Sequence, residues 1–376
     1  MASRSSARRT WAALVVMFLL LATCAPARSP AANPAASTAA VPVVRAPATT
    51  ASAAAPTEPP LSTTVRVGMH GRPDQAALQL AIDRGYFVRQ GLDIEAVPFS
   101  TGPEMVPALS TDQIQVGSGT PSAALFNAFN RGIDIRMVAD WTHIGPDTDR
   151  SLSLVVRSDL ADAGAVQSAV DLRGRTVALG AATGTVADLF FQRLLEREGA
   201  ADIEIDRQNI SLPDIVSALA NRRLDAGILI EPVVTQAVGQ GSARVLYPAG
   251  AVIPGTQVSV LQYSPRFATE QTEGATRFMV GYLEGVRDYY DAFHLKRDRD
   301  AAIELLVQSL SLKSPQLWEA VTPFYVDLNG QINVDNLYEQ AAFYAQQGSL
   351  SGPIPDFGRL VDARFAAAAV QQLGRR

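Results

Sequence analysis

The chain has 376 residues and a formal net charge of −5, so it is long enough for two domains with substantial cores and is mildly acidic. Its 32 lysines and arginines are scattered along the sequence, which argues against nucleic acid as a partner. The three histidines lack the spacing of metal ligands, and no cofactor motif is present, so we expect neither a metal nor a cofactor.

A secretory signal is predicted over residues 1–23. Arg4, Arg8 and Arg9 precede a continuous apolar run at residues 11–22. That run is shorter than the about 20 apolar residues that a membrane-spanning helix needs, so a permanent transmembrane anchor is not expected. The mature protein is therefore predicted to lie outside the cytoplasm.

Cys24 is the only cysteine of the chain, so no disulfide can form within it. It resembles the acceptor cysteine of a bacterial lipoprotein box, although Thr23 replaces the usual Gly, Ala or Ser. The alternative is a signal peptide cut elsewhere, with Cys24 discarded. Lipidation is favoured because residues 24–64 are rich in Ala and Pro and carry few charges. Such a segment cannot form a core and would hold a folded domain off the membrane.

The folded part is predicted to be an α/β domain pair. Strand-like runs alternate with helical patterns in a first series starting at Val65, Asp93, Ile114 and Ile133, and in a second series starting at Ser151, Thr176, Asp225 and Ala243. This alternation predicts open, mostly parallel sheets. From Thr269 onward the pattern is almost wholly helical.

Two turns made of small residues follow predicted strands, one in each series. Residues 117–120 (GSGT) precede a helix that begins at Pro121, and residues 180–185 (GAATGT) precede an amphipathic helix. Small residues let a ligand approach the backbone, and a helix N-terminus presents free N–H groups. A tight turn alone would also need small residues, but two such turns from two domains are what a ligand cleft requires.

Three stretches resemble the periplasmic binding proteins of ABC importers in the sulfonate, nitrate and thiamine-precursor group (SsuA/THI5-like, NMT1). They are LAIDRGYFVRQGLDIEAVPF at 80–99, DLRGRTVALGAATGT at 171–185 and IVSALANRRLDAGILIEP at 215–232. The resemblance implies a type II, two-lobed fold that closes on its ligand like a hinged clamp, a monomer, and an ABC permease as partner. Lobe 1 would comprise residues 65–154 and 260–376 and lobe 2 residues 155–259, with chain crossings near 151–156 and 255–263.

By position, the resemblance also implies ligand-binding residues between the lobes. These are His70, Gly71, Arg72, Asp74, Ser118, Gly119, Thr120, Trp141, Thr142, Thr183, Gly184, Thr185, Glu231 and Tyr263. For three of them a structural role is an open alternative. His70 could be a solvated loop residue, Trp141 a wedge against the hinge, and Glu231 only the cap of the helix that it begins.

The ligand class follows from the same residues. Aromatic walls and mixed hydrogen bonding favour a planar heterocycle, either riboflavin or another flavin, or a thiamine-pyrimidine precursor. An aliphatic sulfonate, taurine or nitrate is the alternative, because Arg72 and the helix ends could bind an anion, although Glu231 would repel one.

A biosynthetic enzyme and a structural lipoprotein are the alternatives from other classes. A eukaryotic branch of the fold makes the thiamine pyrimidine with a cysteine-rich motif and a pyridoxal-phosphate lysine. Here no cysteine follows Cys24, and the only lysines are Lys296 and Lys313 in the helical tail. A structural lipoprotein would not need paired bare turns. We therefore expect a binding protein and not an enzyme.

Overall fold

The computed structural model describes residues 63–180 and 182–376, which belong to one compact unit. The predicted signal, Cys24 and nearly all of the spacer lie outside the described residues. Two five-stranded sheets form the framework. The first has the order β2 (Leu92–Pro98), β1 (Thr63–Met69), β3 (Val116–Gly119), β10 (Gln257–Tyr263), β4 (Arg136–His143), and the second has the order β7 (Asp206–Gln208), β6 (Thr176–Ala178), β8 (Ala226–Ile230), β5 (Leu152–Arg157), β9 (Ala243–Pro248).

Each sheet has one strand that runs against the other four. In the first sheet β10 pairs antiparallel with β3 and β4, and in the second β5 pairs antiparallel with β8 and β9. The remaining pairs are parallel. Each reversed strand is the first strand along the chain after the chain has passed from the other sheet. No α-helix lies directly before either of them. A parallel strand would need such a crossover helix to bring the chain back to the end of the sheet where the neighbouring strand begins.

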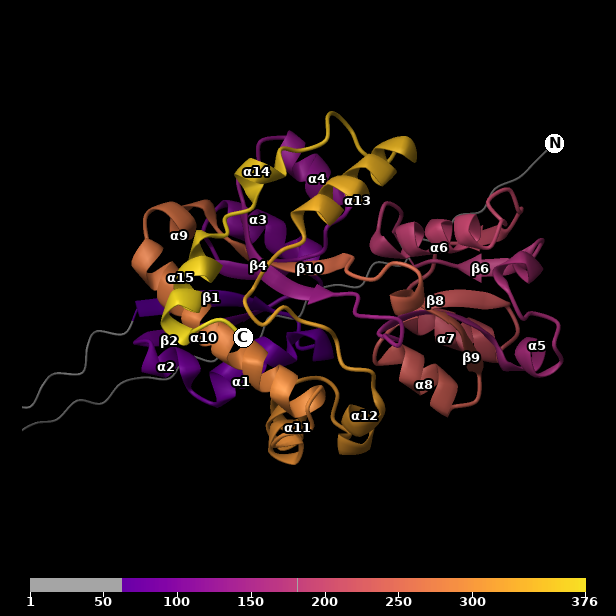
Figure 1. Ribbon diagram of the computed structural model, residues 1–376, viewed down its shortest axis with the longest axis horizontal. Helices are drawn as coiled ribbons and strands as arrows, with labels where there is room; N and C mark the ends of the chain where they lie inside the picture. Colours follow the sequence, from indigo (N-terminus) through magenta and orange to yellow (C-terminus); the bar gives the residue numbers. More distant parts are fainter. Residues whose placement is uncertain (1–62, 181) are drawn as a thin grey trace, which may run out of the picture. The chain divides into compact units, whose positions relative to one another are not determined.

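The first sheet is covered by helices on both faces (Figure 1). One core lies under α1 (Ala76–Asp83), α10 (Thr272–Phe293) and α15 (Arg364–Leu373). The other lies under α3 (Met105–Ser110), α4 (Ala123–Asn130) and α13 (Val334–Gln346). Helix α10 comes from the predicted helical tail and returns to lobe 1, as the two-lobed fold implies.

The second sheet is also covered on both faces. Helix α6 (Val186–Arg197) buries Phe190 and Leu194 against one face, while α7 (Leu212–Ala220) and α8 (Val233–Gly239) cover the other. The helix α6 is amphipathic and begins at a capping box made by Thr185 and Asp188. Together with the first sheet, this makes the mixed α/β, two-lobed architecture that the sequence predicts.

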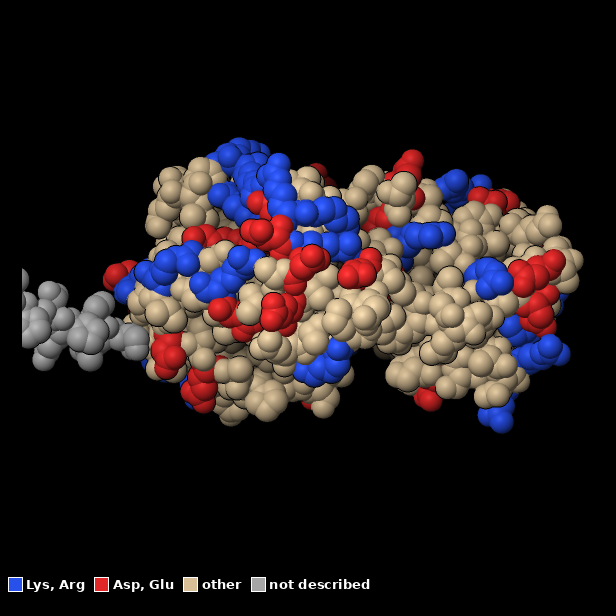
Figure 2. Space-filling view, turned by 90° about the horizontal axis from the view of Figure 1, so that it is seen from below, with Lys and Arg blue, Asp and Glu red and all other residues tan. Residues whose placement is uncertain are grey.

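The remaining helices complete the chain. They are α2 (Tyr86–Arg89), α5 (Ser158–Asp162), α9 (Pro265–Thr269), α11 (Arg299–Ser309), α12 (Pro315–Ala320), α14 (Phe357–Leu360), and the single turns η1 (Pro73–Gln75), η2 (Gly102–Glu104), η3 (Ala169–Leu172) and η4 (Ala249–Ala251). None of the helices in the described part of the chain, α10 included, combines the length and apolarity needed to cross a membrane. On the face drawn in Figure 2, basic and acidic side chains are interspersed, in agreement with their scatter along the sequence.

Two chain segments connect the sheets, at residues 144–151 and 249–256. Both lie earlier than the expected 151–156 and 255–263, because residues from Leu152 onward already pair with β8 and residues from Gln257 onward already pair with β4. The two connections lie against each other at Gly250, whose N–H donates to the carbonyl oxygen of Asp149 at 3.2 Å. A Cβ at Gly250 would lie 2.0 Å from the carbonyl oxygen of Pro146, so only glycine permits this approach.

Candidate ligand-binding site

A cavity of about 390 Å³ lies between the two lobes, at the ends of β1, β3 and β10 on one side and of β5, β6 and β8 on the other. Seven of the fourteen predicted ligand residues line it: His70, Arg72, Asp74, Ser118, Gly119, Thr120 and Thr185. The structure therefore brings both bare turns and the loop after the first strand to one site. Gly71, Trp141, Thr142, Thr183, Gly184, Glu231 and Tyr263 do not line it.

The loop after β1 supplies the charged groups of the cavity. The buried side-chain oxygen of Gln75 accepts hydrogen bonds from the backbone N–H of His70 and of Gly71, at 2.9 and 2.8 Å. This ties the loop to the start of α1. Gly71 contributes backbone contacts behind the loop, since its carbonyl accepts from the N–H of Ser311. Only its neighbours His70 and Arg72 face the cavity.

His70, Arg72 and Asp74 form a small charged group. Arg72 Nε lies 3.3 Å from one oxygen of Asp74, and His70 Nε2 lies 3.6 Å from the other. The His70 side chain is only 2% exposed, so it is not a solvated loop residue. Burial lowers the pKa of His70, and the positive charge of Arg72 lowers it further. The Asp74 carboxylate raises this pKa but does not outweigh burial, so the ring is neutral at pH 7. The group thus presents one positive and one negative charge.

The second bare turn contacts, across the lobes, the helix that follows the first. The backbone N–H of Ala123, the first residue of α4, donates to the carbonyl oxygen of Gly184 at 2.9 Å. Thr183 and Gly184 therefore lie at a contact between lobes and line a separate hollow of about 310 Å³ with Asp188 and Arg207. They do not reach the main cavity.

The helix N-termini are not free anion sites in this structure, contrary to the sequence expectation. At α6, Asp188 accepts hydrogen bonds from the backbone N–H and the hydroxyl of Thr185, at 2.9 and 3.1 Å, and pairs with Arg207. A carboxylate already occupies the positive end of this helix. At α4, Ser122 accepts from the N–H of Leu125, and Gly184 takes the first N–H. An anion would have to be held by Arg72 instead.

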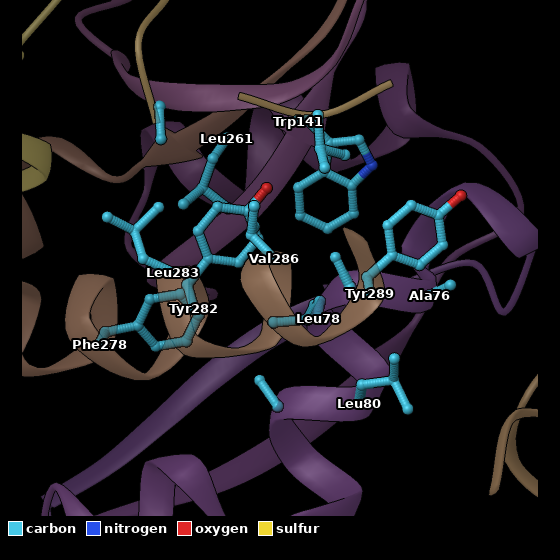
Figure 3. Close-up of a cluster of buried hydrophobic side chains, with 14 of the residues drawn as sticks. Ala76, Leu78, Leu80, Trp141, Leu261, Phe278, Tyr282, Leu283, Val286 and Tyr289 are labelled. Atoms are coloured by element: carbon cyan, nitrogen blue, oxygen red, sulfur yellow. The ribbon is translucent and has the colours of Figure 1, made fainter. Parts of the chain in front are cut away.

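Trp141 and Tyr263 form parts of the lobe 1 core and not a wall of the cavity. Trp141 is 3% exposed and stacks on Tyr282 of α10, with ring centroids 5.8 Å apart (Figure 3). Tyr263 is fully buried, and its hydroxyl donates to the carbonyl oxygen of Ala275 at 2.9 Å. Both side chains lie on the face of the sheet that α10 covers. Thr142 is buried on the neighbouring position and is also out of reach.

Glu231 caps a helix, as the structural alternative proposed, and it also bridges the two lobes. Its oxygens accept from the N–H and the hydroxyl of Thr235 in α8, at 3.1 and 2.8 Å. One of them also accepts from the N–H of Thr322, at 3.1 Å, in the tail that follows α12. Burial raises the pKa of Glu231 in spite of these hydrogen bonds. The carboxylate therefore holds lobe 2 to the helical tail and does not face the cavity.

Comparison with known proteins agrees with this architecture. A family model described as NMT1/THI5 like matches residues 72–292, which is more than half of the chain. The chain belongs to the NMT1/THI5-like family. No curated protein sequence is significantly similar to it.

Solved structures of periplasmic binding proteins share the fold of this NMT1/THI5-like protein. The alkanesulfonate-binding protein SsuA of Xanthomonas axonopodis pv. citri, bound to MOPS, is 20% identical, with 82% of this chain and 100% of that chain covered and a TM-score of 0.60. The aliphatic sulphonate binding protein SsuA of Escherichia coli is 18% identical, with 79% and 97% covered and a TM-score of 0.64. The nitrate-binding protein NrtA of Synechocystis PCC 6803 is 13% identical, with 83% and 89% covered and a TM-score of 0.64.

Sequence reasoning missed two parts of the cavity of this family member. The turn Thr101–Gly102–Pro103 contributes to the lobe 1 side, as do Val258 and Ser259. The lobe 2 side is almost wholly apolar, with Leu152, Leu179, Gly180, Ala182, Val186, Ala187, Leu212, Ile228 and Ile230. Part of the apolar lining could have been predicted from the sequence, because Ile228 and Ile230 share one face of a strand at its carboxyl end.

Proposed function

We propose that this protein is the extracytoplasmic solute-binding component of an ABC importer, and that it binds a small organic solute with a polar head and an apolar body. The observation that carries the proposal is the division of the cavity. Lobe 1 lines it with His70, Arg72, Asp74 and hydroxyl groups, whereas lobe 2 lines it with aliphatic side chains. A solute with the same division would satisfy both sides when the lobes close.

Arg72 is the cation available for an anionic head. Its Nε pairs with Asp74, and within the described chain no side chain pairs with its two terminal guanidinium nitrogens. Its side chain is 54% exposed and lines the cavity, so these nitrogens could make two parallel bonds to a sulfonate or carboxylate. The structural neighbours that bind alkanesulfonates support this choice of head group.

The aliphatic wall of lobe 2 supports an apolar body on the solute. Burying one methylene group contributes about 0.8 kcal/mol, which is roughly a fourfold gain in affinity. Leu152, Leu212 and Ile230 come from three different elements and surround the same space. Affinity should therefore rise along a series of alkanesulfonates until the body fills the cavity.

A planar vitamin-type heterocycle, riboflavin or a thiamine-pyrimidine precursor, is the second candidate. Asp74 favours it, because a carboxylate in the cavity can accept from a ring N–H or an amine and would oppose a simple anion. The aromatic wall expected for such a ligand is missing, since Trp141 and Tyr263 lie in the core. We therefore rank this candidate below the organic anion.

Binding without turnover is proposed for the same site. Lys296 donates to the carbonyl of Phe293, and Lys313 donates to the carbonyls of Val307 and Gln308. Neither lysine lines the cavity, and the described residues that do so include no cysteine. These residues supply no nucleophile of the kind used by the eukaryotic biosynthetic branch.

The location and partners remain parts of the proposal. The predicted signal and Cys24 support an extracytoplasmic protein held to the membrane by a lipid, with the residues up to 64 as spacer. The fold supports delivery of the solute to a membrane permease, because a structure that shares it is the ligand-binding component of an ABC-type import system of Staphylococcus aureus. A monomer with one ligand per chain fits the cavity of about 390 Å³ between the two lobes.

Calorimetric titration and thermal shift test the proposal. The panel is nitrate, taurine, MOPS, the straight-chain alkanesulfonates from methane- to hexanesulfonate, riboflavin and a thiamine-pyrimidine precursor. We expect binding to strengthen with chain length, and Arg72→Ala to weaken it about 10-fold to 100-fold. Arg89→Ala is the matched control, because Arg89 is similarly exposed but pairs with Glu284 on another surface. Tightest binding of riboflavin or the pyrimidine, with Arg72→Ala unchanged, would select the second candidate.

A further inference from the structure

One buried polar side chain is not used by anything described above. Gln262 is the last residue but one of β10 and is 0% exposed, yet neither its side-chain oxygen nor its side-chain nitrogen has a hydrogen-bond partner among the described residues. The other buried glutamines of the described chain, Gln75, Gln79, Gln115, Gln257 and Gln340, all make side-chain hydrogen bonds. An unpaired buried amide destabilises a protein, so its retention calls for a role.

Packing does not explain this glutamine. Its neighbours on the same face of the sheet, Met137 on β4 and Val260 two residues before it, are apolar and belong to the core under α3, α4 and α13. A methionine would fill a similar volume among them without leaving a polar group unpaired. The unpaired amide is therefore unfavourable in this core unless a polar group binds to it.

The amide of Gln262 packs against a residue that lines the ligand cavity. Gln262 pairs with Gly117 across the sheet, but its side chain reaches two residues further along β3, to Gly119. A Cβ at Gly119 would lie 2.5 Å from the side-chain nitrogen and 2.6 Å from the oxygen. Gly119 lines the cavity, so the absence of a side chain at this position brings the amide within one residue of the cavity lining.

We propose that Gln262 is a specificity-determining residue of the cavity, whose amide completes its hydrogen bonds when a ligand head group binds at the Ser118–Thr120 turn. The inference rests on the proposed function, because it assumes a ligand between the lobes. An amide offers one donor and one acceptor side by side. The ligand that satisfies both carries an acceptor oxygen and an N–H or O–H donor, as taurine does with its sulfonate and its ammonium group and as butanesulfonate does not.

The closing experiment compares the purified protein with Gln262→Met and with the control Gln340→Met. Gln340 is equally buried, but its amide donates to Gln257 and Asn336 and accepts from Tyr344. Without ligand, Gln262→Met should melt at or above the temperature of the unsubstituted protein, while Gln340→Met should melt lower. In titrations, Gln262→Met should weaken taurine binding about 5-fold to 10-fold and butanesulfonate binding less.

A second variant tests whether the amide acts through its contact with Gly119. Gly119→Ala should displace the amide and weaken taurine binding, and the double variant with Gln262→Met should be no weaker than the worse single variant, because both remove the same interaction. Additive losses would overturn the inference. So would a melting temperature of Gln262→Met that falls as far as that of Gln340→Met, or unchanged taurine binding. If the unsubstituted protein binds neither sulfonate, the proposed function fails first and this inference fails with it.

Discussion

The substitution Gly250→Ala tests how tightly the two connections between the lobes are packed. Gly250 is not in a left-handed conformation, so alanine brings no backbone strain there. The cost is purely steric, since the added Cβ would lie 2.0 Å from the carbonyl oxygen of Pro146 and 3.0 Å from the Cβ of Asp149. The first contact is with backbone, which cannot rotate away as a side chain can.

The two connections would have to separate by roughly 1 Å to restore ordinary contact distances, since Cβ and oxygen normally stay more than about 3 Å apart. Overpacking of this kind costs about 1 to 3 kcal/mol. We therefore expect the melting temperature to fall by roughly 2 to 8 °C. The hydrogen bond from the Gly250 N–H to Asp149 would weaken as well.

Thermal and urea unfolding provide the measurement, with Gly239→Ala as the control. Gly239 is the last residue of α8, and a Cβ there would meet no atom within 4 Å. Its replacement should leave the stability unchanged or raise it by up to about 1 kcal/mol, because alanine favours a helix. If Gly250→Ala unfolds at the temperature of the unsubstituted protein, the packing of the connections described here is incorrect.

Three further predictions concern single residues elsewhere in the chain. Trp141→Ala should lower the free energy of unfolding by about 3 to 5 kcal/mol in urea titrations, because Trp141 is a core residue. A loss of ligand affinity with unchanged stability would instead indicate that Trp141 contacts the ligand. Burial acts to lower the pKa of His143, but the hydrogen bond with Asp140 and the charges of Asp140, Asp327 and Asp149 outweigh it and raise the pKa. Protonated His143 should thus stabilise the fold fully below pH 6.5, its ordinary pKa, with the contribution lost as the pH rises through the raised value. His143→Gln should abolish this part of the pH profile of unfolding, and an unaltered profile would contradict the assignment. Cys24→Ala should release the protein from the membrane fraction of the producing cells, and unchanged partitioning would exclude the lipid anchor.

Much of the architecture could be predicted from the sequence. The order of strand-like and helical segments, the helical tail after the last strand, and the two bare turns all depend on local patterns that a single sequence displays. The Ser118–Thr120 segment lies at the carboxyl end of β3, the turn before α6 follows β6, and the loop at His70–Asp74 follows β1. The carboxyl ends of such strands meet in space. This is why seven of the predicted residues reach one cavity.

The orientation of individual side chains was decided only by the tertiary structure. Both sheets are covered by helices on each face, so strands such as β4 and β10 are buried on both sides along nearly their whole length and show no alternation that would tell one face from the other. Trp141 and Tyr263 therefore turned out to face α10, while Gln262, one residue before Tyr263, faces the opposite way toward Gly119. Likewise, Glu231 and Gly184 contact the other lobe through Thr322 and Ala123, residues 91 and 61 positions away in the chain, and no local pattern specifies such partners.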